Sequence, residues 1–369
     1  MPAVTWESQA VDGGARAGVL HTPHGPVKTP AFMPVGTRAA VKAVDVDDLE
    51  AISAEIILSN TYHLMLRPGA DLIDMLGGLH GFMGWDGPIL TDSGGYQIFS
   101  LGPDITEEGA SFKSIYDGAR VNLTPEESVS VQERLGPDIA MVLDVCVGLP
   151  APRQTVEAEM RRTLRWAERC LKAHTRPDQE LFGIVQGGVD AELRAESAAA
   201  TAALDFAGFG IGGLSVGESA EERNLALDAA IAQLPSHKPR YVMGLGDTEG
   251  LLEAIGRGAD MFDCVLPTRL ARHGKALSST GDFNINTLGN ESDQTPIDPD
   301  CSCSTCGKHS KAYLRHLIRM KELSAYRLLS IHNLHYTLSL IAAARAAIEA
   351  GHFDVFLTGV MSARADGSP

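Results

Sequence analysis

Residues 241–265 read YVMGLGDTEGLLEAIGRGADMFDCV, and this stretch contains the unit that decides the fold. A short apolar segment at 241–245 is followed by Asp247-Thr248-Glu249, which opens a helical stretch that runs to Arg257. A second apolar segment follows at 261–265. The order strand, helix, strand is typical of a parallel sheet with helices packed on it.

The same alternation extends over most of the chain. Helices begin with recognisable signals, as in Thr124-Pro125-Glu126-Glu127, where a Thr cap, a Pro in the first helical position and a Glu three residues after the cap predict a capping box. Eight strand and helix units predict an α/β fold of the (β/α)8 barrel type, with an open doubly wound sheet as the alternative. The strands are predicted at residues 31–35, 55–59, 88–91, 139–143, 181–185, 208–211, 241–245 and 261–265.

Two segments interrupt the alternation. Asp117-Gly118 lies between β-prone flanks and predicts a hairpin inserted after the third strand, at about residues 103–123. After the eighth strand comes a loop-rich stretch at 269–300, then a cysteine cluster and two long helices. We therefore expect a barrel domain at 1–268 that carries the hairpin, and a helical C-terminal subdomain at 269–369.

Composition excludes several classes of protein. The 369 residues are 44% hydrophobic and 21% charged, as in folded soluble proteins, which excludes disordered, collagenous and coiled-coil chains. No stretch approaches the roughly 18 consecutive apolar residues of a membrane helix, and the start of the chain does not look like a signal peptide, so we expect a cytoplasmic protein.

The net charge of -16 argues against a protein that coats nucleic acid. Residues 301–330 nevertheless contain six basic residues and one acid. On charge alone, this segment fits a solvated helix face and a phosphate-contacting patch equally well.

Cys301, Cys303 and Cys306 form the sharpest local signal in the sequence. The six cysteines of the chain are too sparse for a disulfide framework, whereas three thiolates within six residues suit one tetrahedral zinc ion. The fourth ligand would be a histidine, and His332 can return from a following helix more easily than the adjacent His309. The other candidates are His316 and His335. Because four protein ligands leave no open position, we interpret the zinc as structural.

Three carboxylates, Asp92, Asp144 and Asp263, follow predicted strands, where the functional residues of such barrels lie. One could attack an electron-poor carbon, one could transfer a proton, and one could accept hydrogen bonds from ring N–H groups. A single Asp at a strand end is more often a helix cap or part of an ion pair. Asp263, however, lies within an apolar run, where an unpaired charge is costly.

These residues belong to motifs that resemble the bacterial-type tRNA-guanine transglycosylases, also called queuine tRNA-ribosyltransferases, over nearly the whole chain. The motifs are TPAFMPVGT at 29–37, TDSGGYQ at 91–97, FGIVQGG at 182–188, GGLSVGE at 212–218, YVMGLG at 241–246, DCVLPTR at 263–269, and the cysteine cluster followed by His332.

The resemblance implies a pentosyltransferase that exchanges the wobble guanine of GUN-anticodon tRNAs (Asp, Asn, His and Tyr) for a 7-deazaguanine base in queuosine biosynthesis. It implies that Asp263 attacks the ribose and forms a covalent tRNA intermediate, and that Asp92 is the general acid/base. Base-binding residues would be Ser93, Tyr96, Asp144, Cys146, Gln186, Gly212, Gly213, Leu214 and Met243, with Tyr96 and Met243 on either side of the base and the Leu214 carbonyl near its 7-substituent.

The resemblance also assigns the partners of the protein. Arg269, Arg272 and Lys275 would contact the tRNA backbone together with the basic segment, and this shifts our interpretation of that segment to a phosphate-contacting patch. One structural Zn²⁺ per subunit would be held by Cys301, Cys303, Cys306 and His332, in a homodimer formed through the zinc region.

The sequence departs from the bacterial pattern at Val145, where members usually carry an acidic residue, and at Val147-Gly148-Leu149. Cys146, Val216 and Glu218 follow the pattern associated with 7-aminomethyl-7-deazaguanine, so we favour that base over queuine. A non-catalytic tRNA-binding paralogue is a further alternative, but such a protein would lack the carboxylates that Asp92 and Asp263 supply.

Overall fold

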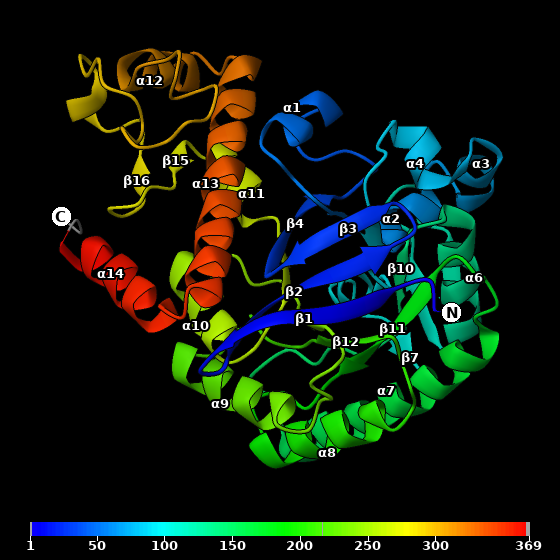
Figure 1. Cartoon of the computed structure of the whole chain (residues 1–369). Coiled ribbons are helices and arrows are strands. Elements are labelled where there is room, and N and C mark those ends of the chain that lie inside the picture. Colours follow the sequence, from blue (N-terminus) through cyan, green and yellow to red (C-terminus); the bar gives the residue numbers. More distant parts are fainter. Residues whose placement is uncertain (1, 216, 367–369) are drawn as a thin grey trace.

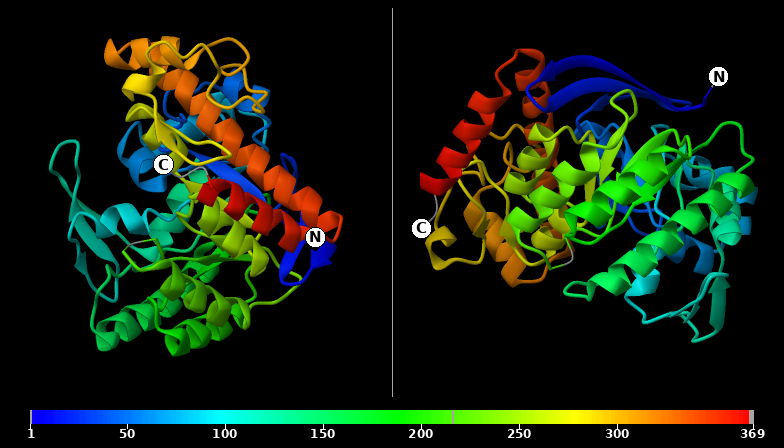
Figure 2. Two further views of the ribbon diagram at one scale, coloured as in Figure 1. Left: turned by 90° about the vertical axis from the view of Figure 1, so that its left-hand side faces the viewer. Right: turned by 90° about the horizontal axis from the view of Figure 1, so that it is seen from below.

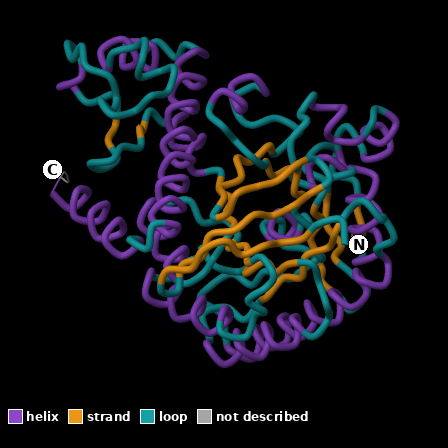
Figure 3. Tube along the Cα trace, in the orientation of Figure 1, coloured by secondary structure: helices purple, strands orange, loops and turns teal. Residues whose placement is uncertain are grey.

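The computed structural model describes residues 2–215 and 217–366 (Figure 1). Eight parallel strands form a closed barrel in the order β10-β11-β12-β13-β14-β4-β5-β6, which confirms the predicted barrel and excludes the open sheet. Figure 3 shows the strands in orange with purple helices around them. The strands are nearly continuous apolar runs because helices cover the outer face of the sheet. They are β4 (Ala31–Gly36), β5 (Ile57–Ser59), β6 (Ile89–Thr91), β10 (Ile139–Met141), β11 (Glu180–Val185), β12 (Gly208–Ile211), β13 (Arg240–Val242) and β14 (Met261–Cys264).

Helices connect successive strands and surround the barrel (Figure 2). Thr124 caps α6, with Glu127 N–H donating to its hydroxyl at 3.2 Å, but the Glu127 carboxylate binds Arg134 at 3.1 Å, so only half of the expected capping box forms. Asp247 caps α10. The helices are α1 (Val46–Ala51), α2 (Thr61–Leu66), α3 (Ala70–Met75), α4 (Gly78–Met83), α5 (Gly95–Phe99), α6 (Pro125–Leu135), α7 (Arg153–Ala173), α8 (Ala191–Ala202), α9 (Ala220–Ile231), α10 (Thr248–Gly256) and α11 (Leu266–Arg272).

The N-terminal residues form an antiparallel sheet that the sequence analysis did not predict. It contains β1 (Thr5–Asp12), β2 (Ala15–Thr22) and β3 (Gly25–Thr29), and it lies across the barrel in front of the viewer in Figure 1. Arg16 forms a buried ion pair with Asp260 and donates to the Ser236 carbonyl at 2.6 Å. These partners precede β14 and β13, so the sheet covers the amino-terminal end of the barrel.

The hairpin predicted after the third strand is present as part of a three-stranded antiparallel sheet, β7 (Asp104–Ile105), β8 (Ala110–Lys113) and β9 (Arg120–Leu123). Its turn contains Gly118 at a φ of 73°, a conformation that glycine adopts without strain. The hairpin projects from the body of the molecule (Figure 2, left). It therefore extends the wall at one side of the barrel mouth.

Three helices, rather than two, follow the cysteine cluster: α12 (Lys311–Arg319), α13 (Leu323–Glu349) and α14 (Phe353–Asp366). They are preceded by β15 (Lys275–Ala276), β16 (Phe283–Asn284) and the short η1 (Leu288–Asn290). Buried side chains of α13 such as Leu334 and Ile341 belong to the same hydrophobic core as the barrel strands. The domain boundary that we placed at residue 268 stays a prediction.

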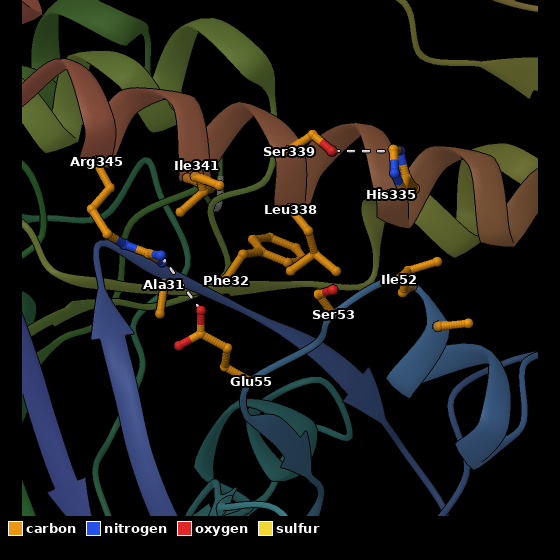
Figure 4. Close-up of a pocket in the computed structure, with 12 residues that line it drawn as sticks. Ala31, Phe32, Ile52, Ser53, Glu55, His335, Leu338, Ser339, Ile341 and Arg345 are labelled. Atoms are coloured by element: carbon orange, nitrogen blue, oxygen red, sulfur yellow. Dashed lines mark hydrogen bonds and ion pairs between the residues drawn. The ribbon is translucent and has the colours of Figure 1, made fainter. Parts of the chain in front are cut away.

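A cavity of about 240 Å³ lies where α13 crosses β4 (Figure 4). Its walls include Phe32, Ile52 and Leu338. The Arg345 guanidinium approaches the Glu55 carboxylate at 3.4 Å and donates to the Pro30 carbonyl at 2.7 Å. Since its charged groups are already paired, we attribute this cavity to the packing of α13.

Among the described residues, no helix is both long and apolar enough to cross a membrane.

Candidate active site

A second cavity, of about 340 Å³, opens at the carboxyl-terminal ends of the barrel strands. It brings together most of the predicted site residues, although these are far apart in the sequence. Its walls contain Asp92, Ser93, Tyr96, Asp144, Cys146, Gly212, Gly213, Leu214, Met243, Asp263 and Arg269. Gln186, Arg272 and Lys275 do not line the cavity, but Gln186 is bonded to the lining residue Asp144.

Asp92 follows β6 and is only 9% exposed. Its carboxylate accepts hydrogen bonds from the Asn60 side-chain amide, from Thr61 N–H at 2.8 Å and from Gln97 Nε2 at 3.0 Å. Burial raises the pKa of Asp92 to about 6; these hydrogen bonds oppose the rise and the charge of Asp263 adds to it. A carboxyl with such a pKa can both donate and accept a proton near neutral pH.

Asp263, at the end of β14, has two oxygens in different surroundings. One oxygen, Oδ1, accepts hydrogen bonds from the Tyr241 hydroxyl at 2.6 Å and from Gly244 N–H at 2.8 Å. Among the described residues, none donates to the other oxygen. Burial raises the pKa of Asp263, whereas the two hydrogen bonds lower it. The group is thus oriented through one oxygen and exposes the other to the cavity, as a nucleophile requires.

Asp144 follows β10 and is 8% exposed. Ser93 Oγ donates to its Oδ1 at 3.0 Å, and Gln186 Nε2 donates to its Oδ2 at 2.7 Å. Burial raises the pKa of this carboxyl as well. A Cβ on Gly95 would lie 2.8 Å from the Asp144 backbone oxygen, so only glycine fits there. The hydrogen bond from Gln186 to Oδ2 also means that Gln186 helps to fix the orientation of the Asp144 carboxylate.

Arg194 of α8 is a residue that the sequence analysis missed. It is fully buried, and it donates to backbone carbonyls only: Gly212 at 2.7 Å, Gly213 at 3.2 Å and two carbonyls near the end of β11. In a trans peptide the N–H points away from the C=O, so the N–H groups of Gly213 and Leu214 are turned away from Arg194. The buried helix positions Leu193, Ser197, Ala198 and Thr201 share its face, and their spacing is the signal that could have identified it.

Several further residues of the cavity wall were also missed. Asn60 and Gln97 donate hydrogen bonds to Asp92, Tyr241 donates one to Asp263, and His63 lines the cavity from α2. Gln97 lies in the motif at 91–97 and Tyr241 in the motif at 241–246, so these two could have been singled out. The sequence around Asn60 and His63 contains no pattern that distinguishes them from ordinary strand-end polar residues.

The remaining base-binding candidates in the cavity wall differ in how far their side chains are exposed. Tyr96 is 58% exposed and Met243 is partly buried, and both contribute to the cavity. That they enclose a base between them stays a prediction. Burial raises the pKa of the Cys146 thiol to about 12, so this group is a neutral thiol in the wall.

Apolar packing surrounds Val145, the position next to Cys146 where the resemblance led us to expect an acidic residue. The Val145 side chain is buried beside Trp166 and Ile98 in a small cavity behind the wall, and its N–H donates to Thr163 Oγ1 at 3.0 Å. This side of the site is therefore held without an ion pair at position 145.

The basic segment at 301–330 is less positive in the structure than in the sequence. Acids from elsewhere in the chain pair with three of its six cations: Arg327 with Asp48 at 2.6 Å, Lys311 with Asp293 at 3.2 Å and Arg315 with Glu291 at 3.6 Å. Of the three residues predicted to contact RNA, Arg269 lines the cavity, whereas Arg272 and Lys275 do not. Lys275 lies 3.6 Å from Asp282.

The cysteine cluster and His332 form a group that can hold a metal ion. His332 Nδ1 lies 3.6, 3.7 and 3.3 Å from the sulfurs of Cys301, Cys303 and Cys306. Ligands at zinc bond lengths in a tetrahedron place nitrogen and sulfur about 3.5 Å apart, so the spacing fits zinc. His332 Nε2 donates to the Leu277 carbonyl at 2.8 Å, which leaves Nδ1 free to bind metal.

The neighbouring His335 does not complete this group, because it contacts Cys301 alone among the three cysteines, at 3.5 Å. Of the histidines considered from the sequence, His332 is thus the one that meets all three sulfurs within the described chain.

Comparison with known proteins agrees with these features. The family model described as queuine tRNA-ribosyltransferase matches residues 12–366. The chain is 51% identical to the queuine tRNA-ribosyltransferase of Herpetosiphon aurantiacus over 360 residues, which are 97% of this chain and 92% of the relative. It is 51% identical to that of Moorella thermoacetica over 358 residues (96% of each chain) and 52% identical to that of Halothermothrix orenii over 337 residues (91% and 90%). Matches of this extent, together with the barrel and the strand-end carboxylates, show that the chain belongs to the queuine tRNA-ribosyltransferase family.

Proposed function

We propose that this protein is a pentosyltransferase that exchanges the wobble guanine of GUN-anticodon tRNAs for 7-aminomethyl-7-deazaguanine, a step in queuosine biosynthesis. The observation that carries the proposal is a pair of carboxylates in one cavity with different surroundings. Asp263 has one oriented and one exposed oxygen, whereas Asp92 has a pKa raised to about 6. A nucleophile and an acid/base are the two groups that a retaining glycosyl transfer needs.

In the first half of the reaction, the exposed Asp263 oxygen attacks C1′ of the ribose. The bond from C1′ to the guanine nitrogen breaks, its electron pair leaves with guanine, and protonated Asp92 donates a proton to the departing base. The product is an ester between Asp263 and the RNA, and Asp92 is left as a carboxylate.

In the second half, Asp92 removes a proton from the incoming base, and the base nitrogen attacks C1′. The ester bond to Asp263 breaks, and both carboxyl groups return to their starting states. Because protons and charges balance over the cycle, the exchange needs no nucleoside triphosphate and follows ping-pong kinetics.

The wall supplies the groups that would recognise the base. Asp144 would accept hydrogen bonds from the base ring, while Gly213 N–H, turned away from Arg194, would donate to the ring carbonyl. A base splayed out of an RNA loop gains stacking in place of its lost neighbours, and Tyr96 with Met243 would provide it.

The preference for an aminomethyl group at position 7 rests on a smaller set of residues. The Leu214 carbonyl would contact this substituent, and Glu218, which accepts a hydrogen bond from Ser215 N–H, would support that loop. Val216, the third residue of the pattern associated with this base, lies outside the described residues.

The C-terminal region would contribute structure and assembly. Cys301, Cys303, Cys306 and His332 would hold one structural Zn²⁺, which links the cysteine loop to α13. We also propose a homodimer through this region, because exposed apolar side chains such as Met320 and Leu323 lie beside it. Figure 1 shows that α12, α1 and α4 lie along the same edge of the molecule.

Incubation of the zinc-loaded protein with tRNA and labelled guanine is the direct test, and incorporation of label is expected. In a competition for the same tRNA, 7-aminomethyl-7-deazaguanine is expected to replace labelled guanine more efficiently than queuine does. A tRNA without guanine at the wobble position is the matched control. No incorporation would remove the proposed function, and preferential use of queuine would change the substrate assignment alone.

The pKa of Asp92 should give the two halves of the exchange different pH dependences. Guanine departure needs the protonated carboxyl, whose pKa is raised to about 6, so kcat/KM for tRNA is expected to fall as the pH rises above 6. The charge of Asp263 contributes to this raised pKa and disappears in the ester. The pKa of Asp92 therefore falls in the intermediate, and kcat/KM for the base is expected to fall only at more acidic pH.

Steady-state measurement of kcat/KM for tRNA and for the base from pH 5 to pH 9 would test both predicted decreases. The affinity for tRNA, measured over the same pH range, is the control. Two profiles that fall together at high pH would contradict the assignment of both roles to Asp92.

A further inference from the structure

Two arginines and a histidine contact Tyr116 at the tip of the inserted hairpin, and Lys42 lies within electrostatic reach of that histidine. The Arg67 guanidinium lies 4.7 Å from the centre of the Tyr116 ring, and that of Arg38 lies 5.4 Å from it. His63 Nδ1 is 3.3 Å from the Tyr116 hydroxyl. We call Arg38, Lys42, His63, Arg67 and Tyr116 the Tyr116 surface.

Among the described residues, no carboxylate forms an ion pair or a hydrogen bond with the cations of the Tyr116 surface. Within residues 2–215 and 217–366, no hydrogen bond or ion pair involves the side chains of Arg38, Lys42 or Arg67. Most other arginines of this acidic protein are paired with carboxylates or backbone carbonyls. The nearest acid is Asp117, which accepts a hydrogen bond from Ala119 N–H at 3.1 Å within its own turn. Hydrogen bonds from Ser114 and Ala119 are the main causes that lower the pKa of Asp117, and the charge of Arg67 adds to them without forming an ion pair. Cations left unpaired in a chain of net charge -16 indicate a site for an anion from outside.

The Tyr116 surface adjoins the reactive cavity. His63 lines that cavity, and Arg38 and Lys42 are close enough to lower its pKa, although burial is the larger cause. These residues follow β4 and β5, and Tyr116 belongs to the insertion after β6. Arg269, which also lines the cavity, follows β14. Since β14, β4, β5 and β6 are successive neighbours in the barrel, the positive and aromatic residues line one continuous side of the mouth.

The loop after β4 is also held in an unusual backbone conformation. Ala39 and Ala43, which follow Arg38 and Lys42, have φ values of 55° and 63°. Residues other than glycine rarely adopt this left-handed region, and such conformations persist where surrounding structure fixes them, often at binding sites. The loop thus presents its two cations in a defined position.

We propose that Arg38, Lys42 and Arg67 bind backbone phosphates of the single-stranded RNA next to the exchanged nucleotide, with Tyr116 as the residue that positions the two guanidiniums. This inference rests on the proposed function, since it takes the RNA loop as the substrate. Guanidinium groups suit phosphate because they donate several hydrogen bonds in one plane, and an aromatic ring beneath them restricts their motion.

The salt dependence of RNA binding tests the proposal without base exchange. Wild-type protein, Arg38→Ala, Arg67→Ala and the double variant are titrated with a labelled anticodon stem-loop from 0.05 to 1 M salt. Each lost phosphate contact is expected to reduce the slope of log affinity against log salt by about 0.7, and to weaken binding on the order of fivefold near 0.1 M salt. Binding near 1 M salt should be almost unchanged.

Arg120→Ala is the matched control. It lies in the same inserted sheet and is exposed, but it pairs with Asp104 at 3.0 Å, so its removal should leave the slope unchanged. Arg38→Lys and Arg67→Lys keep the charge and should retain most of the slope. In turnover, the alanine variants should raise KM for tRNA and leave KM for the base unchanged.

Wild-type affinity and slope in the double variant would overturn the proposal, and so would weaker binding with an unchanged slope, because that result excludes phosphate contacts. Failure of the wild-type protein to incorporate guanine would instead overturn the proposed function, so the two failures are distinguishable.

Discussion

Asp263→Ala is expected to abolish base exchange and the protein–RNA adduct that survives denaturation. The exposed oxygen of Asp263 forms the proposed ester, and no other described carboxylate presents an oxygen to the cavity in this way. Loss of a covalent nucleophile lowers turnover by roughly 10⁴-fold or more. The adduct is measured on denaturing gels after incubation with tRNA in the absence of free base.

Tyr241→Phe is the matched control for this prediction. It removes the hydrogen bond to the other Asp263 oxygen, at 2.6 Å, but keeps the nucleophile. We expect slower adduct formation with a normal final yield. Thermal unfolding of both variants shows whether the barrel is intact. An adduct that persists in folded Asp263→Ala would reassign the nucleophile, with Asp92 as the next candidate.

Cys303→Ser is expected to lose the bound zinc and to loosen the C-terminal region. Cys303 is 3% exposed and lies 3.7 Å from His332 Nδ1, so serine would leave a weaker ligand in a closed site. Because the cluster links the cysteine loop to α13, metal loss should lower the melting temperature by several degrees. Hydrogen exchange should accelerate around residues 301–310 before it does so in the barrel.

Metal analysis of purified protein measures the first effect, and Cys170→Ala provides the control, since Cys170 is a fully buried cysteine of α7 outside the cluster. One zinc per chain is expected in wild-type protein and in the control. Full zinc occupancy in Cys303→Ser would mean that the ligand set is wrong.

The barrel could be predicted from the sequence because its physical signals are local. Most strands, such as 139–141, are short buried apolar runs, and several helices begin at a capping residue such as Thr124 or Asp247. The fold rule then places Asp92, Asp144 and Asp263 at one mouth. The N-terminal sheet was missed although Asp12-Gly13-Gly14 is a turn signal, because exposed positions dominate β1 and hide its alternation.

The parts of the site that were not predicted depend on contacts between distant residues. Asn60 reaches Asp92 from another strand end, and Arg194 reaches Gly212 from a helix, so neither contact leaves a local pattern. Whether a basic residue is paired with an acid also depends on contacts between distant residues. Arg327 is neutralised by Asp48, which lies 279 positions away, whereas Arg38 and Arg67 are isolated in the sequence and come together only around Tyr116.

The N-terminal sheet has a consequence for the fate of the proposed ester. Arg16 and its partners cover the end of the barrel opposite the cavity, and strand side chains such as Phe32 and Phe262 are buried in the packed barrel. Water would reach the proposed aspartyl ester through the cavity mouth, which is also where the RNA would enter. A bound anticodon loop would therefore block the access of water to the ester. This favours transfer of the ribose to a new base over hydrolysis of the ester.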